Sequence, residues 1–204
     1  MDEQAIALRD LSDQIAACPK CSLAKTRTHA VPGEGDPNAQ IVFIGEGPGY
    51  HEDQQARPFV GPAGKFLDEL LASIKLRRQD VYICNVIKCR PPGNRDPLPG
   101  EIEACGPWLE QQLEVIKPRL IVTLGRFSMT RYFPGQAIGR IHGQARRFDN
   151  VTVVPMYHPA AALHQASLRG TIQEDFLKLP AILEAALKEE AKPADPEVKQ
   201  MQLL

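Results

Sequence analysis

Four cysteines have a spacing that could hold a metal centre. Cys18 and Cys21 form a C-x2-C pair, and Cys89 and Cys105 are separated by fifteen residues. Cysteine thiolates bind zinc and iron–sulfur clusters. Zinc ribbons usually use two tight pairs, so the wide second pair favours an iron–sulfur cluster, with zinc as the alternative. The fifth cysteine, Cys84, lies within an apolar run and is interpreted as a small buried hydrophobe.

A second set of reactive side chains follows apolar runs of the sequence. Glu46 comes directly after one such run, Asn85 lies at the end of another, and His158 follows a third. A carboxylate and an imidazole can transfer protons, and an amide offers both a donor and an acceptor. Ligands of open α/β sheets bind beyond the carboxyl ends of the strands. We therefore expect these three side chains to meet at one edge of a sheet.

The elements that would position these residues alternate along the chain. Apolar runs typical of buried strands occupy residues 40–45, 81–86, 120–124 and 151–156. Helical patterns occupy residues 2–17, 63–75, 99–116, 126–133 and 172–188. This alternation predicts an α/β fold, a three-layer α/β/α sandwich with a short central, mainly parallel four-stranded sheet.

Length and composition indicate one domain in the cytoplasm. The 204 residues suit a single domain at 1–188, followed by a charged tail at 189–204 that we expect to be flexible. The chain has no apolar stretch long enough for a membrane span, and its acidic start is unlike a signal peptide. Thiols stay reduced in the cytosol, which favours metal ligands over disulfides.

Charge gives a mixed indication about nucleic acids. The formal net charge is −1, so the chain lacks the overall basic character of many DNA-binding proteins. Two local basic clusters nevertheless occur, and their members are Lys88, Arg90 and Arg95 in the first and Arg140, Arg146 and Arg147 in the second. Either cluster could be a solvated surface or a phosphate-binding one.

The order of several short motifs resembles that of the family 4 uracil-DNA glycosylases, which contain an iron–sulfur cluster. The motifs are the four-cysteine spacing, Gly45-Glu46-Gly47-Pro48-Gly49, Arg57-Pro58-Phe59-Val60-Gly61, Asn85-Val86-Ile87-Lys88-Cys89-Arg90-Pro91-Pro92, and His158-Pro159. Each motif is weak alone, and their combination is specific. The resemblance extends from about Cys18 to Leu183, which is most of the chain.

This resemblance implies an activity, a cofactor and a set of site residues. It implies removal of uracil from DNA and a [4Fe–4S] cluster on Cys18, Cys21, Cys89 and Cys105. It also implies a uracil pocket, formed by Glu46, Phe59, Asn85 and His158. Phe59 would stack on the extruded base, Asn85 would read its polar edge, and His158 would donate to uracil O2 as negative charge develops.

The remaining residues of the implied site have less defined roles. Glu46 could orient water, hold its loop or contact the base, and the backbone N–H of Gly47 could face the base or a phosphate. Glu52 is the candidate for excluding the 5-methyl group of thymine. Lys88, Arg90 and Arg95 are expected to contact DNA phosphates. Leu163, in a segment after His158, is expected to wedge into the duplex.

Two alternatives remain at the level of sequence. One is a glycosylase of the superfamily branch that becomes covalently trapped on DNA, which has Gln in the first motif where this chain has Glu46. The other is a non-catalytic iron–sulfur or zinc module that binds DNA, which would leave Phe59, Asn85 and His158 without a role. We expect an enzyme that acts as a monomer on uracil-containing DNA with multiple turnover.

Overall fold

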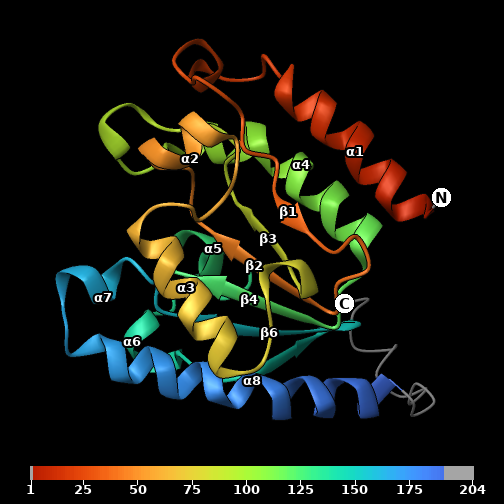
Figure 1. Cartoon of the computed structure of the whole chain (residues 1–204), viewed down its shortest axis with the longest axis vertical. Coiled ribbons are helices and arrows are strands. Elements are labelled where there is room, and N and C mark those ends of the chain that lie inside the picture. Colours follow the sequence, from red (N-terminus) through yellow and green to blue (C-terminus); the bar gives the residue numbers. More distant parts are fainter. Residues whose placement is uncertain (1, 191–204) are drawn as a thin grey trace.

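The computed structural model describes residues 2–190, which form one mixed sheet with helices on both faces (Figure 1). The sheet has six strands in the order β1-β3-β2-β4-β6-β5. Their bounds are β1 (Glu34–Gly35), β2 (Ile41–Gly45), β3 (Tyr82–Asn85), β4 (Leu120–Leu124), β5 (Arg146–Phe148) and β6 (Val151–Met156). The four central strands, β3, β2, β4 and β6, pair in parallel. They are the four strands that the apolar runs predict.

The predicted sheet lacked its two edge strands. β1 pairs antiparallel with β3, and β5 pairs antiparallel with β6. These strands contain only two and three residues, and their side chains are exposed or half-buried. Such short polar segments have no apolar run, so the sequence pattern did not indicate them. The α/β sandwich is confirmed, and the prediction of four strands is corrected to six.

The helices largely follow the predicted positions. Their bounds are α1 (Glu3–Ala16), α2 (Tyr50–Gln55), α3 (Pro62–Ser73), α4 (Pro99–Ile116), α5 (Arg126–Thr130), α6 (Ile138–Ile141), α7 (Ala161–His164) and α8 (Leu168–Glu190), with 3-10 turns η1 (Ser22–Lys25), η2 (Arg78–Asp80) and η3 (Pro92–Asn94). The short helices α2, α6 and α7 were not predicted, since four to six residues are too few for a helical period.

Alternation of side chains along the strands creates two cores. On β2, Val42 and Ile44 point into a core with α1 and α4, while Ile41 and Phe43 point into a core with α3 and α8. Phe43 stacks on Phe176 of α8 with ring centroids 5.7 Å apart. Figure 1 shows the resulting layers, with α1 and α4 on one face of the sheet and α3 and α8 on the other. The central strands are therefore buried on both faces.

The chain reverses its direction of travel across the sheet at β2. The next strand, β3, lies on one side of β2, and β4 lies on the other. Helix connections on opposite faces leave a crevice beyond the carboxyl ends of such strands. This crevice is where the sequence predicts a site.

Two further expectations concern the ends and surface of the chain. Helix α8 continues to Glu190, so the predicted helix end at 188 is two residues short, and the rest of the predicted tail lies outside the described residues. Among residues 2–190, no helix combines the length and apolar character that crossing a bilayer requires.

Candidate active site

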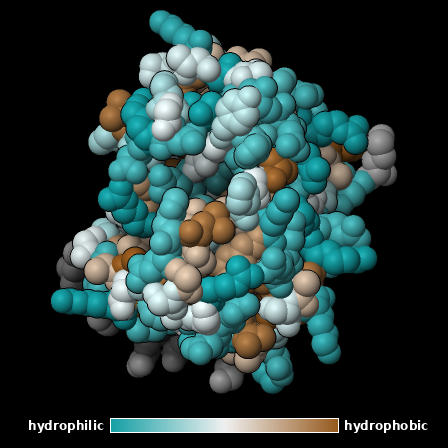
Figure 2. All heavy atoms as spheres, turned by 60° about the vertical axis from the view of Figure 1, so that its left-hand side comes forward, coloured by the Kyte–Doolittle hydropathy of each residue, from teal (hydrophilic) through white to brown (hydrophobic). Residues whose placement is uncertain are grey.

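A cavity of about 210 Å³ opens at the carboxyl ends of β2, β3 and β6. Its lining combines the glycine-rich loop after β2, the loop before α3 and the segments that follow β3 and β6; the predicted members are Glu46, Gly47, Glu52, Phe59, Asn85, Arg95 and His158. Figure 2 brings this side of the molecule forward and shows an apolar area near its centre among hydrophilic side chains. Four separate sequence motifs thus meet at one cavity.

Asn85 ends β3 and contributes a buried amide to this cavity. Its side chain is 2% exposed, and its Oδ1 has no hydrogen-bond partner among the described residues. Gly45 allows this position, because a Cβ there would lie 2.4 Å from Oδ1. A buried acceptor without a partner costs about 1–3 kcal/mol. The cavity therefore presents an amide acceptor that a ligand N–H can satisfy.

Phe59 forms an aromatic wall of the cavity in an uncommon backbone conformation. Its φ angle is +53°, which is in the left-handed region, and its side chain is 6% exposed. Such a conformation costs a non-glycine residue about 1–3 kcal/mol and persists only where the surrounding structure imposes it. The ring stacks on that of His158 with centroids 5.4 Å apart and an interplanar angle of 22°. Gly45 again permits the approach, since a Cβ there would lie 2.7 Å from the Phe59 ring.

His158 is arranged as a neutral hydrogen-bond donor. Its Nδ1 accepts from the backbone N–H of Ala160 at 3.1 Å, so the proton of the neutral ring lies on Nε2. Burial lowers the pKa of His158 to about 4, and the charge of Glu52 opposes this effect only in part. The imidazole is therefore uncharged at neutral pH. The backbone of Gly125 packs closely against His158. A side chain at this position would crowd the histidine, since its Cβ would lie 3.2 Å from the Cβ of His158.

Glu46 lines the cavity in a half-buried position. Burial raises the pKa of its carboxyl group, the charge of Asp96 adds to this effect, and the charge of Arg126 opposes it. Asp96 and Arg126 form an ion pair with each other. Neither residue was predicted as part of the site, because each belongs to a loop or helix start that becomes a neighbour of Glu46 only in the fold. Glu46 therefore binds a proton more tightly than an ordinary glutamate does.

The carboxylate of Glu52 holds two loops of the cavity together. Oε1 accepts from the backbone N–H groups of Val60 and Gly61 at 2.9 and 3.0 Å, and Oε2 accepts from Gly49 at 3.1 Å. The first two amides follow Phe59, and the third belongs to the glycine-rich loop. Both oxygens are engaged by the backbone, so Glu52 supports the two loops, and its exclusion of a 5-methyl group stays a prediction.

The prediction that Lys88 contacts DNA phosphates is wrong. Lys88 is 1% exposed, and its Nζ donates to the backbone oxygen of Asn85 at 2.8 Å and to Oε1 of Gln112 at 2.6 Å. A fully buried ammonium cannot reach a phosphate outside the protein. It ties the end of β3 to α4 instead.

The other predicted DNA contacts lie at the surface. Arg95 is exposed and forms a bidentate ion pair with Glu101. Its Nη2 donates to Oε1 at 2.7 Å, and its Nη1 donates to Oε2 at 2.9 Å. Arg90 lies over the ring of Tyr50 at 5.2 Å. Leu163 on α7 is 48% exposed. These positions suit contacts with DNA, which stay predictions.

The four predicted ligand cysteines surround one small cavity between α1, α4 and the segment after β3. Three of their sulfurs accept N–H hydrogen bonds: Cys18 from Trp108 Nε1 at 3.3 Å, Cys89 from Arg27 Nη1 at 3.1 Å and Cys105 from the backbone of Lys88 at 3.2 Å. Burial raises the pKa of the Cys89 thiol and raises that of Cys105 to about 11, while the hydrogen bond from Arg27 and the charge of Lys88 act in the opposite direction. In the part of the chain that is described, no three or more His, Cys, Asp or Glu side chains form a site for a metal ion. Cys84 is fully buried in β3, as predicted.

The fold and the cavity define an α/β protein with a small cavity at the carboxyl edge of its sheet, where an aromatic ring, an imidazole, an amide and a carboxylate meet. A profile described as the uracil DNA glycosylase superfamily matches residues 32–183. The chain is 48% identical over 182 residues to the type-4 uracil-DNA glycosylase of Archaeoglobus fulgidus, covering 85% of this chain and 92% of that protein. It is 45% identical to the type-4 enzymes of Sulfurisphaera tokodaii and Saccharolobus solfataricus, covering 85% of this chain and 83% and 85% of theirs. The chain belongs to the uracil DNA glycosylase superfamily and, within it, to the type-4 enzymes. The predicted resemblance to family 4 is confirmed.

Proposed function

We propose that this chain removes uracil from DNA by hydrolysing the N-glycosidic bond, releasing free uracil and leaving an abasic site. The observation that carries the proposal is the buried amide of Asn85, with an unpaired acceptor, beside the stacked rings of Phe59 and His158. The cavity, of about 210 Å³, is large enough for a pyrimidine base, and the amide that would read the base is buried in it. The base must therefore leave the duplex stack before it can enter.

Base selection follows from the polar edge of the ring. Uracil presents a donor at N3 and an acceptor at O4, so the Oδ1 and Nδ2 atoms of Asn85 can pair with both. Cytosine presents the reverse pattern and would leave the buried amide unpaired, which discriminates strongly in a closed site. Stacking on Phe59 contributes about 1–3 kcal/mol toward the cost of extrusion.

Bond cleavage leaves negative charge on the uracil ring and positive charge on the sugar. The Nε2–H of His158 can donate to O2 of the departing base and stabilise that charge. A neutral donor suffices, and the low pKa of His158 keeps the ring neutral. Glu46, a half-buried carboxylate in the cavity wall, is suited to orient the attacking water and accept its proton.

The cysteines would hold a [4Fe–4S] cluster, with Cys18, Cys21, Cys89 and Cys105 as ligands. Three N–H···S hydrogen bonds and the adjacent cations of Arg27 and Lys88 fit a negatively charged iron–sulfur group. When bound, the cluster would cross-link the N-terminal segment to α4 and the segment after β3, which makes metal-binding energy part of the folding energy. Glycosidic hydrolysis transfers no electrons, so we assign the cluster a structural role.

We infer a single domain at 1–188 that works as a monomer in the cytoplasm on uracil-containing DNA. Arg90 and Arg95 would contact phosphates, Gly47 would offer a backbone N–H to the base or a phosphate, and Leu163 would support the opened base step.

Release of free uracil from an end-labelled oligonucleotide tests the proposal. We expect the cluster-loaded protein to release uracil and Asn85→Ala to release it at least about 100-fold more slowly. Asn150→Ala, an exposed amide away from the cavity, is the matched control and should keep full activity. A loaded wild-type protein that binds DNA without releasing uracil would instead support the non-catalytic module. A protein–DNA adduct that survives denaturing electrophoresis would support the covalently trapped branch.

A further inference from the structure

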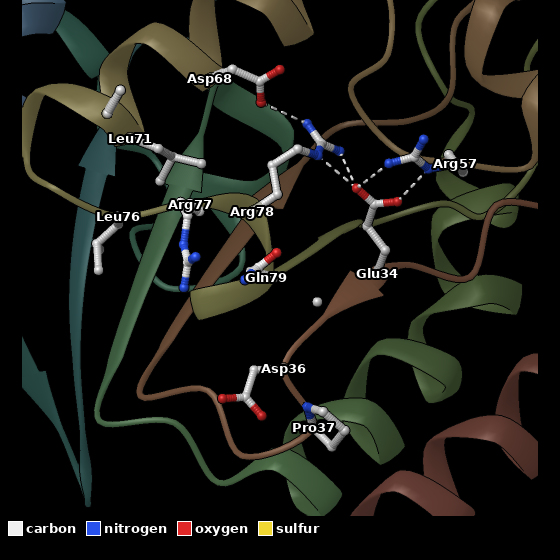
Figure 3. Close-up of a pocket in the computed structure, with 12 residues that line it drawn as sticks. Glu34, Asp36, Pro37, Arg57, Asp68, Leu71, Leu76, Arg77, Arg78 and Gln79 are labelled. Atoms are coloured by element: carbon white, nitrogen blue, oxygen red, sulfur yellow. Dashed lines mark hydrogen bonds and ion pairs between the residues drawn. The ribbon is translucent and has the colours of Figure 1, made fainter.

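Arg78 of η2 lies behind the Phe59 loop and outside the uracil cavity. Its Nη1 donates to the backbone oxygen of Phe59 at 3.0 Å, and its Nη2 donates to the backbone oxygen of Pro58. The guanidinium also pairs with Glu34 at 2.6 Å and with Asp68 at 3.0 Å (Figure 3). Only 19% of the side chain is exposed, so these groups replace most of its hydration.

The Phe59 loop needs support on both sides. On the far side of Phe59, Oε1 of Glu52 holds the N–H groups of Val60 and Gly61. On the other side of the loop, Arg78 donates to the backbone carbonyls of Pro58 and Phe59. Phe59, with its left-handed φ angle of +53°, lies between the hydrogen bonds of Arg78 and those of Glu52. A conformation that a bulky residue seldom adopts is thus fixed by one cation and one carboxylate.

We propose that Arg78 is a positioning residue for base recognition, which holds Phe59 in the conformation that stacks on uracil. This inference rests on the proposed function, because it assigns the stacking role to Phe59. Arginine suits the position because its planar fork can donate to two carbonyls and two carboxylates at once, whereas a lysine ammonium cannot. Glu34 and Asp68 would orient the fork rather than bind substrate.

The neighbouring arginines provide matched controls. Arg57 forms an ion pair with the same Glu34 at 2.7 Å, and no described bond joins it to the carbonyls of the Phe59 loop. Arg77 precedes Arg78 directly and pairs with Asp80 instead, with 70% of its side chain exposed. The two controls therefore separate two other effects from loss of the Arg78 hydrogen bonds: Arg57 tests loss of an ion pair with Glu34, and Arg77 tests loss of a charge next to η2.

The first experiment compares Arg78→Met with Arg57→Met and Arg77→Met in the cluster-loaded protein. We expect single-turnover uracil release by Arg78→Met to fall by about 10- to 100-fold, since misplacing a positioned group by about 1 Å can cost about 100-fold. The two control variants should stay within threefold of the wild type. Hydrogen exchange of the peptide that contains Val60 and Gly61 should accelerate in Arg78→Met alone. If Arg78→Met does not fold, Arg78→Lys replaces it, with a smaller rate loss and the same local acceleration.

A double-mutant cycle separates positioning from general stability. If Arg78 acts through the Phe59 ring, Arg78→Met should lower the rate by less than about threefold when Phe59 is already alanine. Equal losses in both backgrounds would overturn the inference, and so would unchanged exchange at Val60 and Gly61. If the wild type releases uracil and Arg78→Met releases it at the same rate, the inference about Arg78 is refuted and the proposed function stands. A wild-type protein that releases no uracil refutes the proposed function, and the exchange measurement then still decides whether Arg78 holds the loop.

Discussion

The geometry of His158 separates binding from catalysis at the level of one side chain. Its Nδ1 is occupied by the N–H of Ala160, and its Nε2–H remains for the substrate. A donor aimed at charge that develops only in the transition state lowers the barrier more than it strengthens ground-state binding. The ring should therefore matter little for DNA affinity and greatly for turnover.

Replacement of His158 by alanine tests this separation. We expect His158→Ala to lower the rate of uracil release by about 100- to 1,000-fold, the usual cost of one such donor. The dissociation constant for uracil-containing DNA should change by less than about threefold. Single-turnover kinetics and a fluorescence binding assay measure the two quantities. Equal losses in both would show that His158 acts in binding.

The pH dependence of the reaction should report Glu46. If Glu46 accepts a proton from water, its charged form is required, and the rate falls as pH drops through its pKa. That pKa is raised above 4.5 by burial and by Asp96, so this limb should lie above the range of an ordinary glutamate. His158 contributes no limb near neutral pH, because its pKa is about 4.

Glu46→Gln identifies the limb. The variant should be slower at neutral pH and should keep a nearly constant rate from pH 8 down to about 5. Measurement of the single-turnover rate across this range gives the profile. If the Glu46→Gln variant is slower at every pH but its rate still falls at the same acidic pH as that of the wild type, another group is responsible for the titration.

Individual elements differ in how far the sequence could predict them. The four parallel strands are continuous apolar runs because both of their faces are buried, and the structure places them within a residue of the predicted bounds. β1 and β5 depend on pairing with an edge, which leaves no apolar pattern. The cavity residues could be predicted because most of them follow these strands. The roles of Arg78, Asp96 and Arg126 could not, since their contacts cross from one element to another.

Lys88 shows the limit of adjacency in sequence. It precedes Cys89, a proposed cluster ligand, and lies near Arg90, yet its side chain enters the core beside Gln112 of α4. Only the fold shows that this lysine is buried and hydrogen-bonds to two other elements of the core. The ammonium lies beside the carbonyl of Asn85 and near the thiol of Cys105, so it lies between the end of β3 and the cysteines.

Replacement of Lys88 should therefore destabilise the protein without reducing its phosphate contacts. Lys88→Met leaves two buried oxygens without their donor, at about 1–3 kcal/mol each. We expect the melting temperature to fall by several degrees relative to Lys65→Met, an exposed control on α3. The slope of DNA affinity against salt concentration should stay unchanged in Lys88→Met and decrease by about one in Arg90→Met. A reduced slope in Lys88→Met would restore the phosphate role.

On the scale of the whole molecule, four cysteines from three separate segments of the chain meet at one small cavity. Cys18 and Cys21 follow α1, Cys105 lies within α4, and Cys89 follows the strand end that bears Asn85. Helix α1 also buries Leu8, Leu11 and Ile15 in the core shared with α4. The four thiols were recognisable from spacing, whereas the N–H donors around them come from Arg27, Lys88 and Trp108, which no spacing rule indicates.

Removal of one ligand should loosen this face before it affects the opposite one. We expect Cys105→Ala to lose iron and its visible absorbance and to melt at a lower temperature, because the cross-link between the N-terminal segment and α4 is lost. Hydrogen exchange should accelerate in α1 and η1, while α3 and α8, which pack on the other face of the sheet, keep their protection. Cys84→Ala is the matched control, since it removes a buried thiol outside the cluster and should retain iron. Full iron content in Cys105→Ala would contradict the assignment, and so would zinc in place of iron in the purified wild type. Uniform acceleration of hydrogen exchange across all helices would show that the cluster supports the whole fold rather than one face.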